Sequence, residues 1–232
     1  MVWSWIPQNI SQIVQLTLEN AYLGVASALI GLGISVPLGI ACVRWKLLYP
    51  PVLSVASALY AIPSLAMFVI LIAFTGLSDA TVIIPLTLFS LCVLVPNVVD
   101  GLRSVPEPVR QAATAMGFGP LRRLAQVELP VAIPVIVAGL RVATISSISL
   151  ASLGQLIGVS SLGYFFIDGL QRDFPTEIFV GIAMVILLAL AADLALVVVR
   201  RLLTPWQRRR LRPAPPSVLT PVPADRELAE AR

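Results

Sequence analysis

Two ionisable side chains, Arg141 and Asp193, stand inside stretches of sequence that are otherwise apolar enough to cross a membrane. At a rise of about 1.5 Å per residue, Arg141 lies roughly 16 Å beyond Pro130 and Asp193 roughly 10 Å before Arg200. Charges at such depth are costly and rare, and they usually pair or mark a path for ions and solutes. We expect these two to pair or to share a water-filled cavity. Two roles stay open, an ion pair that fixes helix packing and a lining of the translocation path.

Side chains for hydrolytic, metal or redox chemistry are scarce. The chain has no histidine, the usual neutral-pH base and metal ligand. Its two cysteines, Cys42 and Cys92, lie in apolar runs, which favours simple packing over a disulfide or a metal site. A P-loop needs a lysine after a glycine-rich turn, but the single lysine, Lys46, follows Trp45 and precedes Leu47. We expect no catalytic residue, no metal ligand and no ATPase site in this chain.

The longest polar interruption, residues 111–130, has an order of its own. A short helix is predicted over residues 107–116, with Gly117 ending it. A second short element is predicted to open at Pro120. A passive connection between membrane spans needs no such order, so the segment is predicted to be a docking surface.

The first of these helices would present a surface suited to a partner. Ala112, Ala113 and Met116 are predicted to lie on or near one face, where alanines allow close approach and methionine adapts to its neighbour. Three arginines are expected to rim the surface: Arg110, Arg122 and Arg123.

The elements that must position these residues are membrane spans. The chain has 232 residues, of which 58% are hydrophobic and 12% charged, whereas soluble domains carry about 25% charged residues. About 20 apolar residues cross a bilayer. The predicted spans are residues 20–43, 52–75, 81–99, 131–159 and 178–199.

Prolines and small residues recur in these spans. The prolines are Pro37, Pro63, Pro85, Pro96 and Pro134. The small residues of the first span stand four apart: Ser27, Gly31, Ser35 and Gly39. Such a stripe allows close helix packing, and membrane helices tolerate proline kinks.

Basic residues gather in alternate connections between the spans. They are Arg44, Lys46, Arg103, Arg110, Arg122, Arg123, Arg200, Arg201, Arg208, Arg209, Arg210 and Arg212. The two remaining connections hold four acidic residues and only Arg172 as a basic one. The positive-inside rule then predicts an outside N-terminus, a cytoplasmic C-terminus and a cytoplasmic loop at about residues 101–130.

The two ends of the chain differ from the spans. Residues 3–16 form a patchy amphipathic stretch with two tryptophans, as expected of an interfacial anchor. We expect one transmembrane domain over residues 1–205. Residues 206–232 are expected to form a basic, proline-rich cytoplasmic tail without a packed helix.

From Gln111 onward the sequence resembles the cytoplasmic signature of permease subunits of binding-protein-dependent ABC importers. That signature reads Glu-Ala-Ala, three residues, Gly, nine residues, Ile, any residue, Leu-Pro. Here Gln111-Ala112-Ala113 precede Gly117 at the right spacing, and Val127-Glu128-Leu129-Pro130 close the pattern. Gln111 and Val127 depart from it, and Gln111 puts an ionic contact at that position in doubt.

Three further stretches resemble permeases of the osmoprotectant group, which import glycine betaine, carnitine, choline or proline. They are residues 61–66, 127–141 and 156–163, and the resemblance extends over about residues 16–181. The third stretch is poorer in glycine than is usual in that group. Tyr164, Phe165 and Phe166 follow it. They are expected to form either a short gating or interfacial helix or an aromatic cage for a quaternary ammonium group.

The resemblance implies an all-α, type I ABC importer permease fold in the plasma (inner) membrane of a prokaryote. It implies three kinds of partner: ABC ATPase subunits, an extracytoplasmic solute-binding protein, and a second permease copy or paralogue. No nucleic acid partner is expected. ATP and Mg²⁺ would be used by the ATPase, with no cofactor on this chain. The residues expected to couple to the ATPase are Gln111, Ala112, Ala113, Met116, Gly117, Leu129 and Pro130.

Two other functions stay open at this point. One is the same architecture with another small cargo, such as an amino acid. The other is an ATP-independent secondary carrier, which would show paired inverted repeats and ion ligands at the midplane.

Overall fold

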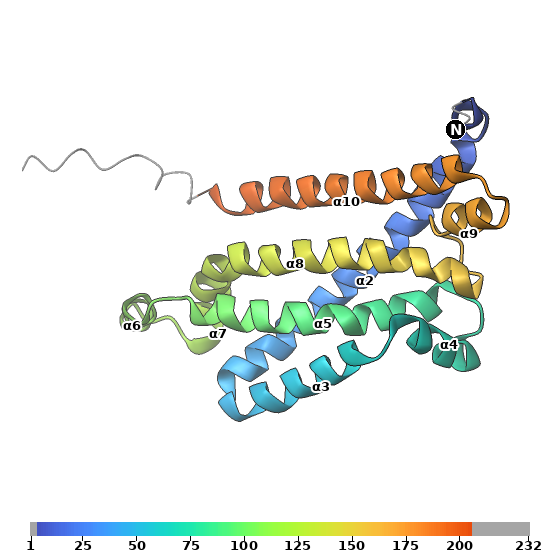
Figure 1. The fold of residues 1–232 in the computed structure, drawn as a ribbon. Coiled ribbons are helices and arrows are strands. Elements are labelled where there is room, and N and C mark those ends of the chain that lie inside the picture. Colours follow the sequence, from blue (N-terminus) through green and yellow to red (C-terminus); the bar gives the residue numbers. More distant parts are fainter. Residues whose placement is uncertain (1–3, 206–232) are drawn as a thin grey trace, which may run out of the picture.

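The structure, a computed structural model, describes residues 4–205. These residues form helices and no strand (Figure 1). The elements are α1 (Trp5–Gln8), α2 (Ile10–Arg44), η1 (Lys46–Leu48), α3 (Tyr49–Ala61), α4 (Ser64–Thr75), α5 (Asp79–Arg103), α6 (Glu107–Ala115), α7 (Pro120–Arg123), η2 (Leu124–Glu128), α8 (Leu129–Ala151), η3 (Ser152–Ile157), α9 (Tyr164–Gln171) and α10 (Pro175–Leu203). The predicted all-α class is confirmed. The predicted tail, residues 206–232, lies outside the described residues.

Within residues 4–205, four segments are long and apolar enough to cross a membrane, and the number rises to five if a bent helix pair is counted as one span. The single segments are Ile10–Arg44, Asp79–Arg103, Pro120–Ile157 and Pro175–Leu203. These candidates agree with the predicted number of about five spans.

The second predicted span is broken rather than straight. α3 and α4 meet at an angle of 93°. Ile62 and Pro63 between them are extended, both with ψ of 128°. Proline disfavours the helical conformation in the residue before it and has no N–H to donate, so the helix stops here. The predicted span over residues 52–75 is thus divided into two helices at Pro63, one of the prolines noted in the sequence.

The first helix begins earlier than predicted. α2 starts at Ile10 and runs for 35 residues. It therefore includes the second half of the predicted amphipathic stretch, and among the described residues the four-residue helix α1 precedes it. Ile13 and Leu16 are buried in one cluster with Phe165 and Val180.

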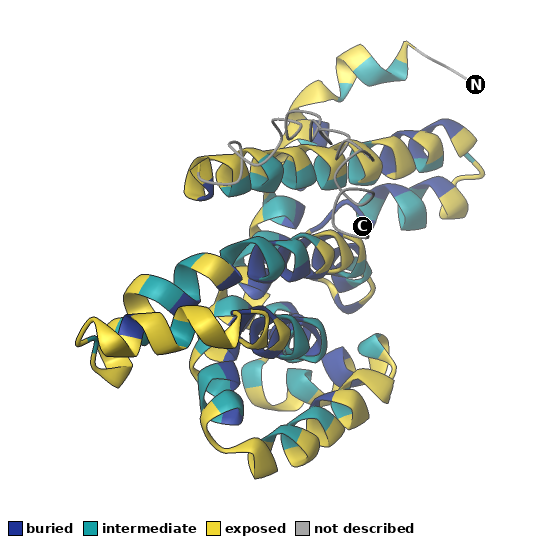
Figure 2. Cartoon of the chain, turned by 90° about the vertical axis from the view of Figure 1, so that its left-hand side faces the viewer, coloured by how far each residue is buried: buried dark blue, intermediate teal, exposed yellow. Residues whose placement is uncertain are grey.

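α5 lies at the centre of the bundle and packs against both α2 and α8. Figure 2 shows exposed residues over the outer surfaces and buried residues where helices face one another. The predicted small-residue stripe of α2 is buried along its whole length. A Cβ atom added at Gly31 would lie 2.9 Å from the Cβ of Ser90 on α5, so the missing side chain sets the helix spacing.

Gly24 and Gly33 of α2 form a matched pair for testing this packing. A Cβ atom at Gly24 would lie 2.8 Å from the Cα of Ile148, whereas one at Gly33 would have nothing within 4 Å. We expect Gly24→Ala to destabilise the protein by about 1–3 kcal/mol, because backbone atoms cannot move aside. Gly33→Ala should be neutral or stabilising, because alanine favours the helix by roughly 1 kcal/mol. Thermal unfolding in detergent compares the two, and equal midpoints would contradict the packing.

The two ends of the bundle differ in what they carry (Figure 1). At one end, called the loop end, lie α6 and α7 together with the last turns of α2 and α10. At the opposite end, called the far end, lie α4 and α9. The loop end is the place of the signature segment.

Candidate functional site

The signature segment begins with a helix whose end is tightly defined. α6 spans Glu107–Ala115, close to the predicted residues 107–116. Gly117 follows with φ of 82°. Its N–H donates to the Thr114 carbonyl at 3.0 Å, and the N–H of Phe118 donates to the Ala113 carbonyl at 3.1 Å. This pair of bonds is a Schellman cap, which requires a left-handed residue and so favours glycine.

The next element begins where the sequence predicts. α7 opens at Pro120, with Gly119 before it in an extended conformation. Proline suits the first position of a helix because its missing N–H would have no partner there. The backbone preferences of glycine and proline therefore determine where α6 ends and α7 begins.

The residues that α6 exposes differ from the prediction in one respect. Met116 is 69% exposed, and Gln111 and Ala112 are exposed as well. Ala113, by contrast, is only 2% exposed. The predicted common face of Ala112, Ala113 and Met116 is thus divided, with Ala113 fixing the helix and the other two facing outward.

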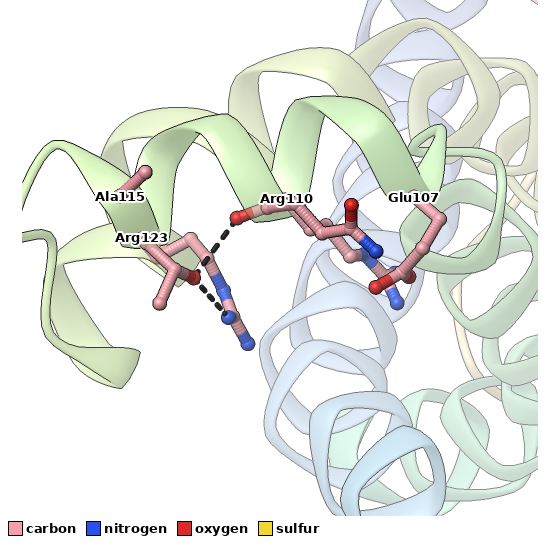
Figure 3. Close-up of a pocket in the computed structure, with 6 residues that line it drawn as sticks. Glu107, Arg110, Ala115 and Arg123 are labelled. Carbon is pink, nitrogen blue, oxygen red and sulfur yellow. Dashed lines mark hydrogen bonds between the residues drawn. The ribbon is translucent and has the colours of Figure 1, made fainter.

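Beside this exposed face lies a hollow of about 500 Å³ (Figure 3). Its lining residues are Glu107, Arg110, Gln111, Thr114, Ala115 and Arg123. Arg123 donates from Nη1 to the Thr114 hydroxyl at 3.0 Å, and that hydroxyl donates to the Arg110 carbonyl at 2.9 Å (Figure 3). The hollow therefore combines charge with ordered donors and acceptors, as a docking surface requires.

Of the three arginines expected at the rim, one matches that expectation fully. Arg122 is exposed and lies over the ring of Phe118, 4.7 Å from its centroid. Arg110 and Arg123 are instead half-buried and lie against Glu128. Glu128 occupies a position of the signature that is open to any residue, so the signature does not predict its contacts with these two arginines.

Leu129 and Pro130 lie at the first turn of α8 and are half-buried. Leu129 packs against a cluster that includes Val98, Leu102 and Ala132. These two residues connect the signature segment to the helix bundle and are not part of the exposed surface.

The structure brings Arg141 and Asp193 together, away from the signature segment. Arg141 of α8 donates from Nε to Oδ1 of Asp193 at 2.6 Å and from Nη2 to Oδ2 at 2.7 Å. The two side chains are 30% and 23% exposed. Such a bidentate pair fixes direction as well as distance between α8 and α10.

Asn20 is a buried polar residue whose contacts were not predicted from the sequence. It is fully buried in α2 and donates to the Ile148 carbonyl at 3.0 Å. Its Oδ1 accepts from the Ser152 hydroxyl at 3.3 Å and from the Leu162 N–H at 3.4 Å. Asn20 thus ties α2, η3 and the connection to α9 together, and its only sequence signal was an amide in an apolar run.

The three aromatic residues after the third family stretch are used in packing. They lie at the start of α9, which is a short helix as one of the two readings proposed. Phe165 is fully buried, with its ring centroid 5.9 Å from that of Trp5 and 5.7 Å from that of Tyr164. A buried Phe165 is not available to an aromatic cage.

Comparison with known proteins agrees with the signature. Residues 31–209 match the family described as binding-protein-dependent transport system inner membrane component. A choline transport system permease protein of Bacillus subtilis is 30% identical over 208 residues, covering 90% of this chain and 96% of that protein. An osmoprotectant import permease protein of Salmonella typhimurium is 32% identical over 202 residues, covering 85% of this chain and 94% of that protein. A carnitine transport permease protein of Listeria monocytogenes is 34% identical over 194 residues, covering 83% of this chain and 85% of that protein.

Among solved structures, the methionine ABC transporter MetNI in an inward-facing conformation has the same fold. The TM-score is 0.73 at 21% identity, covering 88% of this chain and all of that one. At that identity the likeness concerns the fold, which is that of a type I ABC importer permease. With the match over residues 31–209, the chain belongs to the family of binding-protein-dependent transport system inner membrane components.

Proposed function

We propose that this permease subunit imports a small compatible solute, driven by separate ATPase subunits that dock on the exposed face of α6. The observation that carries the docking surface is the capped turn at Gly117, which holds Gln111, Ala112 and Met116 outward at the loop end. The ATPase subunits would supply ATP hydrolysis with Mg²⁺. This chain's own residues would bind the partner and pass its movement to the spans.

The loop end would face the cytoplasm. Supporting this, the basic turns after α2 and α5, the signature segment and the end of α10 share the loop end (Figure 1). The acidic connections that contain Asp79 and Asp168 belong to the far end, where an extracytoplasmic binding protein would deliver solute. The positive-inside rule gives this orientation.

A second permease copy or paralogue would complete the pathway. α10 supports this idea, because its buried residues all lie near its first turns, at Thr176, Glu177, Val180 and Gly181. Beyond Gly181 one face of the helix is half-buried against the chain's own bundle, where it packs on α8. The opposite face is exposed and apolar, with Ile186, Leu190 and Leu194. Lipid and a second permease are the environments in which an apolar helix face of this kind is stable.

The proposed cargo class follows the relatives, whose names specify choline, carnitine and osmoprotectants. The test is ATP-driven uptake by the complete complex in liposomes, with labelled glycine betaine, choline, carnitine, proline and methionine as the panel. We expect uptake of at least one of the first four. Uptake of methionine alone would assign the chain to amino-acid import instead.

A further inference from the structure

A cluster of three charged side chains connects the signature segment to the beginning of α8. Glu128 is 7% exposed, and its Oε1 accepts from Nε of Arg123 at 2.9 Å. Nε of Arg110 lies 3.8 Å from the same oxygen. Arg110 also donates from Nη2 to the Leu102 carbonyl at the end of α5, at 2.6 Å. We call Arg110, Arg123 and Glu128 the Glu128 clasp.

The clasp depends on a local departure from α-helical geometry. Arg123 and Glu128 are five residues apart and would point about 140° apart around a regular α-helix. Residues Leu124–Glu128 instead form a π-helical turn. In a π turn each residue bonds to the fifth one along, which narrows the angle between Arg123 and Glu128 and lets their side chains meet at 2.9 Å. π turns of this kind are frequent at functional sites.

Without the clasp, little would hold α6 in place. α6 has nine residues, too few to be stable alone, and its one buried residue is Ala113. It packs mainly against α7 and η2, the two elements that carry Arg123 and Glu128. The glycines of the turn, Gly117 and Gly119, have no atom within 4 Å of an added Cβ, so the turn itself is not braced by packing.

We infer that Glu128 is a positioning residue that makes α6 and α8 move as one body during transport. The inference rests on the proposed function. A partner that displaces α6 would transmit the movement through Arg110 and Arg123 to Glu128, and from there directly into α8. With Glu128 uncharged, two half-buried arginines would lie close together without the carboxylate that both approach, Arg123 at 2.9 Å and Arg110 at 3.8 Å. Movement of α6 would then be absorbed at the Gly117–Gly119 turn.

The experiment compares uptake and ATP hydrolysis in the same liposomes, which contain the permease, its ATPase subunits and its binding protein. The probes are labelled glycine betaine, choline, carnitine and proline. For Glu128→Gln we expect the complex to assemble and to hydrolyse ATP. The amount of solute taken up per ATP should fall at least about fivefold, since breaking a buried pair is strongly unfavourable.

Two further variants sharpen the result. Asp100→Asn removes an exposed carboxylate from the same end of α5 and should keep the wild-type ratio of solute to ATP. The double variant Arg123→Gln, Glu128→Gln should couple no worse than Glu128→Gln alone, because residues that act as a unit are not additive. If the complex that carries Glu128→Gln fails to assemble, Arg123→Gln is tested in its place. In that variant the charged carboxylate of Glu128 still lies beside Arg110.

The outcomes separate the clasp from the proposed function. A wild-type ratio in the tested variant overturns the clasp. The clasp is also overturned if both single variants lose assembly, ATP hydrolysis and uptake in equal proportion, because such a loss indicates a defect in folding alone. A wild-type complex that takes up none of the four solutes with ATP contradicts the proposed function itself.

Discussion

Replacing Gly117 with valine is expected to reduce ATP-driven uptake about 5–30-fold, whereas asparagine is expected to retain most of it. The residue has φ of 82°, and an added Cβ would meet nothing within 4 Å. The effect is therefore conformational rather than steric. A side-chain-bearing residue in this conformation costs roughly 1–2 kcal/mol, which corresponds to that range.

Asparagine is the matched control at this position. It tolerates the left-handed conformation because its short polar side chain can hydrogen-bond locally, and it occurs at helix ends in place of glycine. Valine would release the bonds from Gly117 and Phe118 to the last turn of α6, and Met116 would lose its fixed direction. Equal uptake by both variants would show that the cap has no part in coupling.

Removing Asp193 alone is expected to lower the amount of permease that accumulates in the membrane severalfold. Asp193→Leu leaves Arg141 charged inside a span, without its two hydrogen bonds at 2.6 and 2.7 Å. The double variant Arg141→Met, Asp193→Leu removes both charges and should recover most of the protein. Quantitative immunoblots of membranes measure this, and a double variant no better than the single one would contradict a mutual pair.

Uptake by the double variant then distinguishes the two roles left open for this pair. We expect uptake to recover together with protein amount, because the pair joins α8 to the part of α10 that lies beyond its fully buried residues. A double variant that accumulates normally but takes up no solute would instead place the pair on the translocation path.

The spans and the signature helix could be predicted because local rules determine them. Apolar length predicts α5 and α10 to within a few residues, and Gly117 and Pro120 mark a helix end and a helix start by their own backbone preferences. The buried stripe through Gly31 is predictable for a similar reason, because small residues four apart share one face of a helix.

The remaining features depend on contacts between distant parts of the chain. Pro63 predicts an interruption of the helix but not the angle of 93° between α3 and α4, both of which pack against α5. The periodicity of an α-helix places Arg123 and Glu128 on different sides of the helix. The sequence therefore does not predict the π turn that brings the two side chains together. Burial of Ala113 and the contacts of Asn20 likewise follow from the arrangement of whole helices.

The most direct test of the account is photo-crosslinking from Met116 in membranes that contain the assembled transporter. Met116 is 69% exposed at the loop end, and Leu170 is 76% exposed at the far end, so the two probes are matched in accessibility. A photoreactive residue at 116 is expected to crosslink to the ATPase subunit, and one at 170 is not. Crosslinking to the ATPase from 170, or from neither position, would contradict the claim that α6 is the surface on which the ATPase docks.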